Sequence, residues 1–294
     1  MTETLTGKAV IFINSYGRNG NCKNSMGFDI NKCIIFHLAK QYLQNPQNGG
    51  ETLRVKEILF EHSFINIYEA NIIFENCTFY KSKLIAKGNN CSQLLISGSK
   101  WFSKKTINSS QSLFKASWFQ KIIIINCKVI NIKFDTSKPK VLPELFKLAH
   151  IENLTVTNSN FENISSTVFH WKDILVFILD KSTFKHCNGK QSGALYSVIN
   201  NFNCLVIIKN TTFVFCNSKY GGGGTKIYIP TNNFFHKTTK HSRFLFNLSN
   251  SLSKTIKPLS RSGILICLID SKFYRCNSRQ NGGGVGIFQE TKEA

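Results

Sequence analysis

Carboxylates are the residues that could give this chain a polysaccharide-cleaving activity. A hydrolase of glycosidic bonds needs two or three of them on one face, and a lyase needs a cluster that holds calcium beside a basic residue that takes a proton. The 294 residues include five aspartates, no two of them within six positions of each other: Asp29, Asp135, Asp173, Asp180 and Asp270. Asp180 and Asp270 fall at expected turns, where aspartate is an ordinary choice. The spacing therefore predicts no catalytic pair.

Histidine, glycine and cysteine indicate no stronger site. His150, His170 and His186 lie at strand ends or in turns, where a surface histidine is usually incidental to catalysis. The quartet Gly221–Gly224 runs into a strand that ends at Pro230, whereas a phosphate-binding loop needs Gly-Lys-Ser/Thr entering a helix. The ten cysteines form no Cys-x-x-Cys pair and no zinc-type spacing with histidine. We predict no catalytic residue, no metal and no cofactor, and the sequence identifies no ligand-binding residue.

The chain is strongly basic, with 37 Lys+Arg against 16 Asp+Glu and a formal net charge of +21. Nucleic acid, anionic lipid and acidic glycan are the partners that such a charge suits. The lysines are scattered, however, and are enriched together with Asn, Ile and Phe, as AT-rich coding sequence would produce, which favours background composition. The longest apolar run, Ile174–Leu179, is too short for a membrane helix, and Met1–Lys8 does not open a signal peptide, so neither is predicted.

Seven eight-residue segments align without gaps, which indicates an internal repeat. Each ends on a large apolar residue, which we call the anchor: Phe79, Trp101, Val129, Phe161, Phe184, Phe213 and Phe273. The residues five and seven positions before each anchor are always apolar, and the residue two before is always small. The residue three before is Asn, Gly or Asp, except at Lys181. This pattern predicts short strands broken by a residue that tolerates a left-handed turn.

The spacing of the anchors, 22, 28, 32, 23, 29 and 60 residues, predicts the fold. Three short strands and three turns in each coil fit an all-β architecture, the right-handed parallel β-helix, whose coils stack at about 4.8 Å. We expect about seven or eight coils, with each column of the alignment forming one row of the solenoid. The last spacing corresponds either to two coils or to one coil with a large insertion.

A second column contains Phe114, Phe146 and Phe169, each fifteen residues before the next anchor, and we interpret it as the third strand of a coil. Lys115, Lys147 and His170 follow these residues directly as an outward row suited to acidic glycans, although ordinary solvated residues are favoured. Nucleic acid is disfavoured as a partner because the aromatic residues occupy core columns.

The row six positions before the anchors is expected to face outward, yet six of its seven members are apolar: Ile73, Leu95, Ile123, Thr155, Ile178, Ile207 and Cys267. We call this row the outer stripe. An exposed apolar stripe of this length marks an association site. We therefore predict that a segment of this chain, another domain or a partner protein covers it. The alternative is that these residues serve strand propensity alone.

Cys187, Cys216 and Cys276 each lie three residues after an anchor. Neighbouring coils bring their Cα atoms within the disulfide range, but laddered side chains point the same way and disfavour the required dihedral angle. We predict reduced thiols stacked in a ladder.

Two regions lie outside the repeats. Residues 1–54 match no template, and the apolar residues of Asp29–Leu43 recur at helical spacing, so we expect a small helical cap on the solenoid of residues 55–294. The segment 230–262 is polar and basic, which predicts an insertion on the solenoid wall with an irregular strand at Phe244–Leu248.

Three segments of the C-terminal half, FKHCNGKQSGALY, FVFCNSKYGGGG and FYRCNSRQNGGGV, begin at Phe184, Phe213 and Phe273. They resemble the F-x-x-N and G-G-apolar-apolar repeats of polymorphic outer-membrane proteins, and the repeats of large protist surface proteins with a pectin-lyase-like fold. The resemblance implies a cell-surface or secreted, membrane-associated context. From this context and from the missing catalytic pair, we predict a non-enzymatic structural or adhesive role. The alternative is a carbohydrate-active β-helix enzyme, a polysaccharide lyase or glycoside hydrolase, in which carboxylates would gather on one wall.

Overall fold

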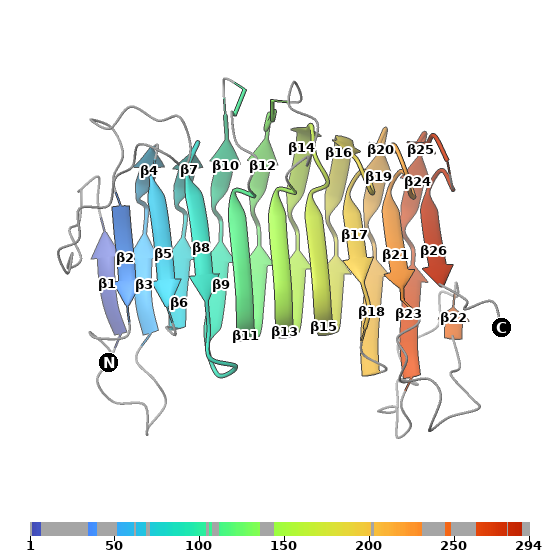
Figure 1. Ribbon diagram of the computed structural model, residues 1–294. Helices are drawn as coiled ribbons and strands as arrows, with labels where there is room; N and C mark the ends of the chain where they lie inside the picture. The colour runs from blue at the N-terminus through green and yellow to red at the C-terminus, as the bar shows by residue number, and fades with distance from the viewer. Residues whose placement is uncertain are drawn as a thin grey trace.

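The computed structural model describes residues 2–6, 35–39, 52–61, 63–68, 71–103, 106–107, 112–135, 144–200, 203–230, 245–247, 263–280 and 282–289. These residues form an all-β structure with two parallel sheets of 16 and 10 strands. The chain passes between the two sheets in every coil, which is the arrangement of a parallel β-helix. Figure 1 shows the coils side by side, from β1 at the N-terminal end to β26 at the C-terminal end.

Each coil has a first strand, an anchor strand and a third strand. The first strands are β1 (Thr2–Thr6), β3 (Thr52–Lys56), β6 (Asn71–Glu75), β9 (Gln93–Ser97), β18 (Asn203–Lys209), β22 (Leu245–Asn247) and β23 (Gly263–Ile269). The anchor strands are β4 (Leu59–Glu61), β7 (Thr78–Tyr80), β10 (Lys100–Phe102), β12 (Lys128–Ile130), β14 (Asn160–Ile164), β16 (Thr183–Gly189), β19 (Thr212–Val214) and β24 (Lys272–Tyr274). Two short strands, β20 (Asn217–Ser218) and β25 (Asn277–Ser278), pair beside the end of β16.

The third strands are β2 (Ile35–Ala39), β5 (Phe64–Tyr68), β8 (Lys83–Lys87), β17 (Leu195–Val198), β21 (Thr225–Ile229) and β26 (Val285–Gln289). Three longer strands join the third strand of one coil to the first strand of the next: β11 (Phe114–Ile125), β13 (Phe146–Thr157) and β15 (Phe169–Asp180). The predicted third-strand column is confirmed, because Phe114 pairs with Phe146 and Phe146 with Phe169.

The predicted anchor column is one continuous row, in which every anchor pairs directly with the next, from Phe79 to Phe273. The ring of Phe184 stacks on Phe161 at 4.7 Å and on Phe213 at 5.0 Å, close to the spacing of adjacent strands. One further copy precedes the seven, because Phe60 pairs with Phe79 and stacks on it at 5.1 Å. The sequence pattern hides this coil, since Glu57 and Ile58 replace the usual turn former and small residue.

The residues five and seven positions before the seven predicted anchors form the inward side of the first strands. All fourteen are buried: Ile72, Phe74, Leu94, Ile96, Ile122, Ile124, Leu154, Val156, Phe177, Leu179, Val206, Ile208, Ile266 and Leu268. They meet the anchors and the third-strand phenylalanines in one hydrophobic core that runs along the solenoid. The predicted inside–outside assignment of these strands is therefore confirmed.

The turn column adopts the left-handed backbone in every coil. The φ angles are 53° at Asn76, 58° at Gly98 and 47° at the exceptional Lys181, and the other members are Asn126, Asn158, Asn210 and Asp270. A left-handed residue reverses the direction of the chain within one position, which is why Asn and Gly dominate this column.

The small residues between turn and anchor form a hydrogen-bond ladder along the corner. The Ser159 hydroxyl donates to the Thr157 carbonyl at 2.9 Å and accepts the backbone N–H of Cys127 at 3.1 Å. Ser182 repeats this arrangement with Asp180 and Ser159. A larger side chain at this buried position would displace the next coil, so the size restriction seen in the sequence has a packing cause.

The 60-residue interval is one coil with an insertion, since Phe213 pairs directly with Phe273. Within the insertion the predicted irregular strand exists as β22, whose three residues pair in parallel with β23. β22 extends the row of first strands beyond β23, at the C-terminal end of the solenoid. We predicted instead that the insertion lies on the wall of the solenoid. The remainder of segment 231–262 lies outside the described residues.

Within Asp29–Leu43, where we predicted a helical cap, the structure describes residues 35–39 alone, and these are not helical. Residues Ile35–Ala39 of that segment form strand β2, which pairs in parallel with β5 and extends the row of third strands. β1 extends the first strands in the same way by pairing with β3. Hydrogen bonding to an existing sheet edge favours a strand here over the helix that the apolar spacing predicts. The rest of the predicted cap lies outside the described residues.

Removal of one anchor should destabilise the whole stack. We expect Phe184→Ala to lower the free energy of unfolding by about 3–5 kcal/mol, because a fully buried ring between two stacked rings leaves a cavity. Denaturant unfolding followed by circular dichroism measures the change. The half-buried neighbour Val214, which points outward from β19, is the control, and an equal loss in Val214→Ala would contradict the assigned register.

Substitution of Lys181, the exceptional turn residue, should increase the stability of the protein. Lys181 has φ 47° and its side chain is exposed, so Lys181→Gly should stabilise the protein by about 0.5–1 kcal/mol by removing the cost of a left-handed lysine. Lys128→Gly, in the extended strand β12, should destabilise it. Thermal unfolding of the two variants side by side tests the assignment, and a loss of stability in Lys181→Gly would refute it.

Candidate functional site

The aspartates considered as catalytic candidates occupy different positions of the coil. Asp270 is a left-handed turn residue with φ 47°, and Asp180 ends β15, where its carboxylate lies 3.5 Å from the Lys209 ammonium. Asp173 lies at the corner after a third strand, 3.7 Å from His150, and Asp29 is outside the described residues. Across the described ranges, no three His, Cys, Asp or Glu side chains form a group that could hold a metal ion.

The three histidines singled out from the sequence each stack on an aromatic ring of a neighbouring coil. The ring centroids of His150 and Trp118 are 4.1 Å apart, those of His170 and Tyr196 4.8 Å, and those of His186 and Phe215 5.0 Å. All three pairs are members of rows, so the histidines contribute to the same ladder packing as the anchors.

His170 also has an acidic partner. Its Nδ1 lies 3.1 Å from Oε1 of Glu144, and both side chains are largely buried. Burial acts to raise the pKa of Glu144, but the hydrogen bond and charge of His170, together with the charge of Lys147, hold that pKa below its usual range. Glu144 is therefore ionised at neutral pH and fixes the orientation of the imidazole.

The glycine quartet owes its composition to close packing between coils. Gly221–Gly224 are buried and stack on the next Gly-rich segment, so a Cβ at Gly223 would collide with the Gly283 carbonyl and one at Gly224 would meet the Phe273 ring. None of the four residues has a positive φ angle. The quartet leads into strand β21 and not into a helix.

The row that begins at Lys115 and Lys147 exists and extends further than predicted. These two residues pair directly, His170 follows, and the row continues through Tyr196 to Lys226. Two positions along each strand, a second outward row adds Lys87 and Lys172. We call the outward positions of the third strands from β8 to β21 the basic face. None of its outward third-strand positions is Asp or Glu, and it carries five accessible lysines: Lys87, Lys115, Lys147, Lys172 and Lys226. A sixth lysine, Lys83 at the start of β8, is on the same side of the strand but is buried.

The other two faces of the solenoid pair their charges. On the first-strand face Arg54 lies 3.4 Å from Glu75, and on the anchor face Lys185 lies 3.5 Å from Glu162. Beside the basic face the Glu144 carboxylate lies 3.1 Å from His170. Among the lysines of this face, the shortest contact with a described carboxylate is 4.0 Å, between Lys172 and the corner residue Asp173. The positive charge is thus concentrated on one face.

The aromatic ring in the middle of the basic face, that of Tyr196, is covered. Tyr196 has His170 against its ring, and the Lys226 ammonium lies 5.5 Å from its centroid. The same ammonium lies 5.1 Å from the Phe288 ring and donates to Oε1 of Gln191 at 3.1 Å. Burial lowers the pKa of Lys226.

The outer stripe faces outward, as predicted. Ile73, Leu95, Ile123, Thr155, Ile178 and Ile207 pair in one row and are half-buried, while Cys267 at the end of the row is buried. The described part of the chain leaves this row accessible, so the predicted cover stays a prediction.

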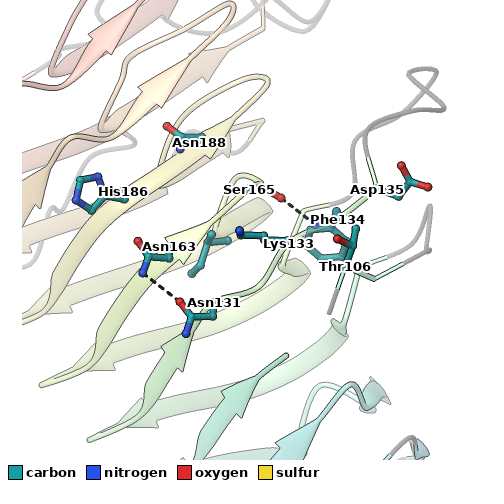
Figure 2. A pocket seen from close by; sticks show the side chains of 10 residues that line it. Thr106, Asn131, Lys133, Phe134, Asp135, Asn163, Ser165, His186 and Asn188 are labelled. Atoms are coloured by element: carbon teal, nitrogen blue, oxygen red, sulfur yellow. Dashed lines mark hydrogen bonds between the residues drawn. The ribbon is translucent and has the colours of Figure 1, made fainter. Parts of the chain in front are cut away.

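A groove that the sequence analysis did not identify lies at the corner after the anchor strands (Figure 2). Its volume is about 820 Å³, and Asn131, Asn163 and His186 follow one another along it, one per coil. Each lies two residues after an anchor and has a φ angle between 52° and 56°. This second left-handed column mixes several residue types, so a search for repeated chemistry overlooks it.

Comparison with protein-family models, with curated proteins and with solved structures finds no match for this chain. Among the described residues, no helix has the length and apolar character needed to cross a membrane.

The predicted thiol column is present with free cysteines. Each thiol contacts the carbonyl oxygen of the anchor in the previous coil, at 3.5–3.6 Å. The pairs are Cys187 with Phe161, Cys216 with Phe184 and Cys276 with Phe213. The hydrogen bond with Cys187 and burial raise the pKa of Cys216, although the hydrogen bond with Cys276 acts in the opposite direction. Burial also raises the pKa of Cys127 to about 12.

These thiols should resist alkylation in the folded protein. Because iodoacetamide reacts with the thiolate, burial and a pKa of about 12 should slow the labelling of Cys127 by roughly a thousand-fold relative to the exposed Cys91. Peptide mass spectrometry after timed labelling measures both rates. In denaturant the rates should become equal, and a Cys187–Cys216 disulfide in unreduced protein would contradict the thiol ladder.

Proposed function

We propose that this chain is a non-enzymatic structural or adhesive module, a right-handed parallel β-helix of a cell-surface or secreted protein, whose basic face binds an acidic polysaccharide. The observation that carries this proposal is the segregation of charge: five accessible lysines occupy the outward positions of the third strands, while the carboxylates beside them are Glu144, which pairs with His170, and the corner residue Asp173. The right hand follows from the strong preference of parallel crossover connections. The surface context rests on the resemblance of the Phe184, Phe213 and Phe273 repeats.

The spacing of the lysines suits a polymer that lies along the solenoid. Lys115 and Lys147 are directly paired on adjacent strands, and Lys172 and Lys226 follow on later coils, so cations recur at multiples of about 4.8 Å. A single exposed ion pair contributes little, but a chain with an acidic group on each sugar engages several at once.

An acidic glycan fits this face better than a nucleic acid. Single-stranded nucleic acid binds by stacking its bases on exposed aromatic rings. The ring of Tyr196 is occupied by His170 and Lys226, and no other Phe, Tyr or Trp belongs to the described row from Lys115 to Lys226.

The second candidate is a carbohydrate-active enzyme, a polysaccharide lyase or glycoside hydrolase, acting on the same substrate class. One arrangement favours it: His170, oriented by the ionised Glu144, lies beside Tyr196 and one coil from Lys147. A histidine so oriented can take a proton, and a lysine can face the acidic group of a sugar. Formation of shortened, unsaturated or reducing products distinguishes this candidate from simple binding.

Two lysine pairs provide a matched test of the basic face. Lys115→Gln with Lys147→Gln removes two cations on adjacent strands of this face, and Lys100→Gln with Lys128→Gln removes two on adjacent strands of the anchor face. We expect the first double variant to bind polygalacturonate and heparin about tenfold more weakly, and the second to bind almost as the parent does. Affinity should also fall as sodium chloride is raised, since exposed charges are screened.

Isothermal titration at low salt measures these affinities. Equal losses in the two double variants would show that only net charge matters and would contradict the assignment to the basic face. Failure of both polyanions to bind the parent protein at low salt would contradict the proposal itself.

A further inference from the structure

The groove of Figure 2 differs from the basic face in position and in chemistry. It lies after the anchor strands β12, β14 and β16, on three adjacent coils. Its lining contains one lysine and one aspartate, so its charge is balanced. The charged residues are Lys133 and Asp135. The other eight are amides, hydroxyls, an imidazole and two apolar side chains: Thr106, Asn131, Phe134, Asn163, Ile164, Ser165, His186 and Asn188.

The amides of the groove keep hydrogen-bonding capacity beyond their own ladder. Asn163 Nδ2 donates to Asn131 Oδ1 at 3.1 Å, a bond that Figure 2 draws as a dashed line between the two labelled side chains. It leaves the Asn131 amino group and the Asn163 carbonyl without a protein partner among the described residues. Asn188 likewise accepts from Asn217 at 2.9 Å and keeps its amino group. Donors and acceptors therefore alternate along the groove.

The backbone holds these side chains in place. Asn131, Asn163 and His186 have nearly the same left-handed φ angle, so their side chains leave the corner in the same direction at intervals of about 4.8 Å. His186 is further fixed by stacking on Phe215 at an interplanar angle of 3°. Such an array has little conformational entropy to lose when a ligand binds.

The inner side of the groove is apolar. Phe134 and Ile164 are buried there, and the backbone N–H of Phe134 is already used by the Ser165 hydroxyl at 2.8 Å. An apolar inner wall with a few fixed polar groups at the rim is the usual form of a small-ligand site, and a volume of about 820 Å³ accommodates more than one sugar ring.

We propose that this groove binds an uncharged oligosaccharide, whose hydroxyl groups bond to the amides of Asn131, Asn163 and Asn188 above a floor formed by the buried Phe134 and Ile164. Hydroxyl groups both donate and accept, which matches the alternating amide groups. The balanced charge of Lys133 and Asp135 gives no preference for an acidic sugar. The site is separate from the basic face, so the protein has two carbohydrate surfaces of different selectivity.

Glycine variants test the groove without disturbing the turn, because glycine tolerates a positive φ angle. We would titrate cellohexaose, maltohexaose and chitohexaose into isotopically labelled protein and follow the side-chain amide signals by NMR. At least one of these should shift the Asn131 and Asn163 signals, and Asn131→Gly with Asn163→Gly should weaken its binding about tenfold or more. The control is Asn158→Gly, a left-handed asparagine with φ 48° at the other corner of the same coil.

The outcomes separate this proposal from the function proposed for the basic face. Retained binding in Lys115→Gln with Lys147→Gln supports the groove, whereas loss of binding in that variant would overturn it. Absence of any shift with all three oligosaccharides, or an equal loss in Asn158→Gly, would also overturn it. Unchanged melting temperatures confirm that the glycine variants are folded.

Discussion

Hydrogen bonding between successive coils at one strand spacing is the constraint on which the rest of the structure depends. It places equivalent residues of adjacent coils about 4.8 Å apart and in direct contact. Each column therefore needs side chains that can pack against the equivalent side chains of the coils on either side. Phe161, Phe184 and Phe213 meet this condition with nearly parallel rings. The 60-residue interval before Phe273 satisfies the same condition. The insertion lies between two strands of one coil in the sequence, and Phe213 still pairs directly with Phe273.

The same constraint organises the outside of the solenoid. Outward positions of a strand fall into rows as strictly as inward ones, so surface chemistry accumulates face by face. Five lysines form the basic face, an apolar outer stripe follows the first strands, and amides line the groove after the anchor strands. Recognition of an extended ligand is therefore a property of rows, and single residues such as His170 act as members of a ladder.

Columns defined by side-chain type could be predicted from the sequence, including the anchors, the inward apolar pairs, the turn residues and the outward row of Lys115. The groove could not, because Asn131, Asn163 and His186 share a backbone conformation and not a chemistry. The coil of Phe60 was hidden by Glu57 and Ile58, whose backbone keeps the turn while their side chains depart from the pattern. The helix expected within Asp29–Leu43 was wrong at β2, because apolar spacing carries no information about the open edge of β5 with which that segment pairs.

Distance along the solenoid depends on the number of coils and not on the number of residues. Spin labels at outward positions of the anchor strands measure this directly. Thr78 is five coils from Thr212 and six from Lys272, although 60 residues separate the last two. Pulsed electron paramagnetic resonance should give distances from Thr78 to these two sites that differ by one strand spacing, about 5 Å. A difference of two strand spacings or more would show that the insertion forms a coil of its own and would contradict the account.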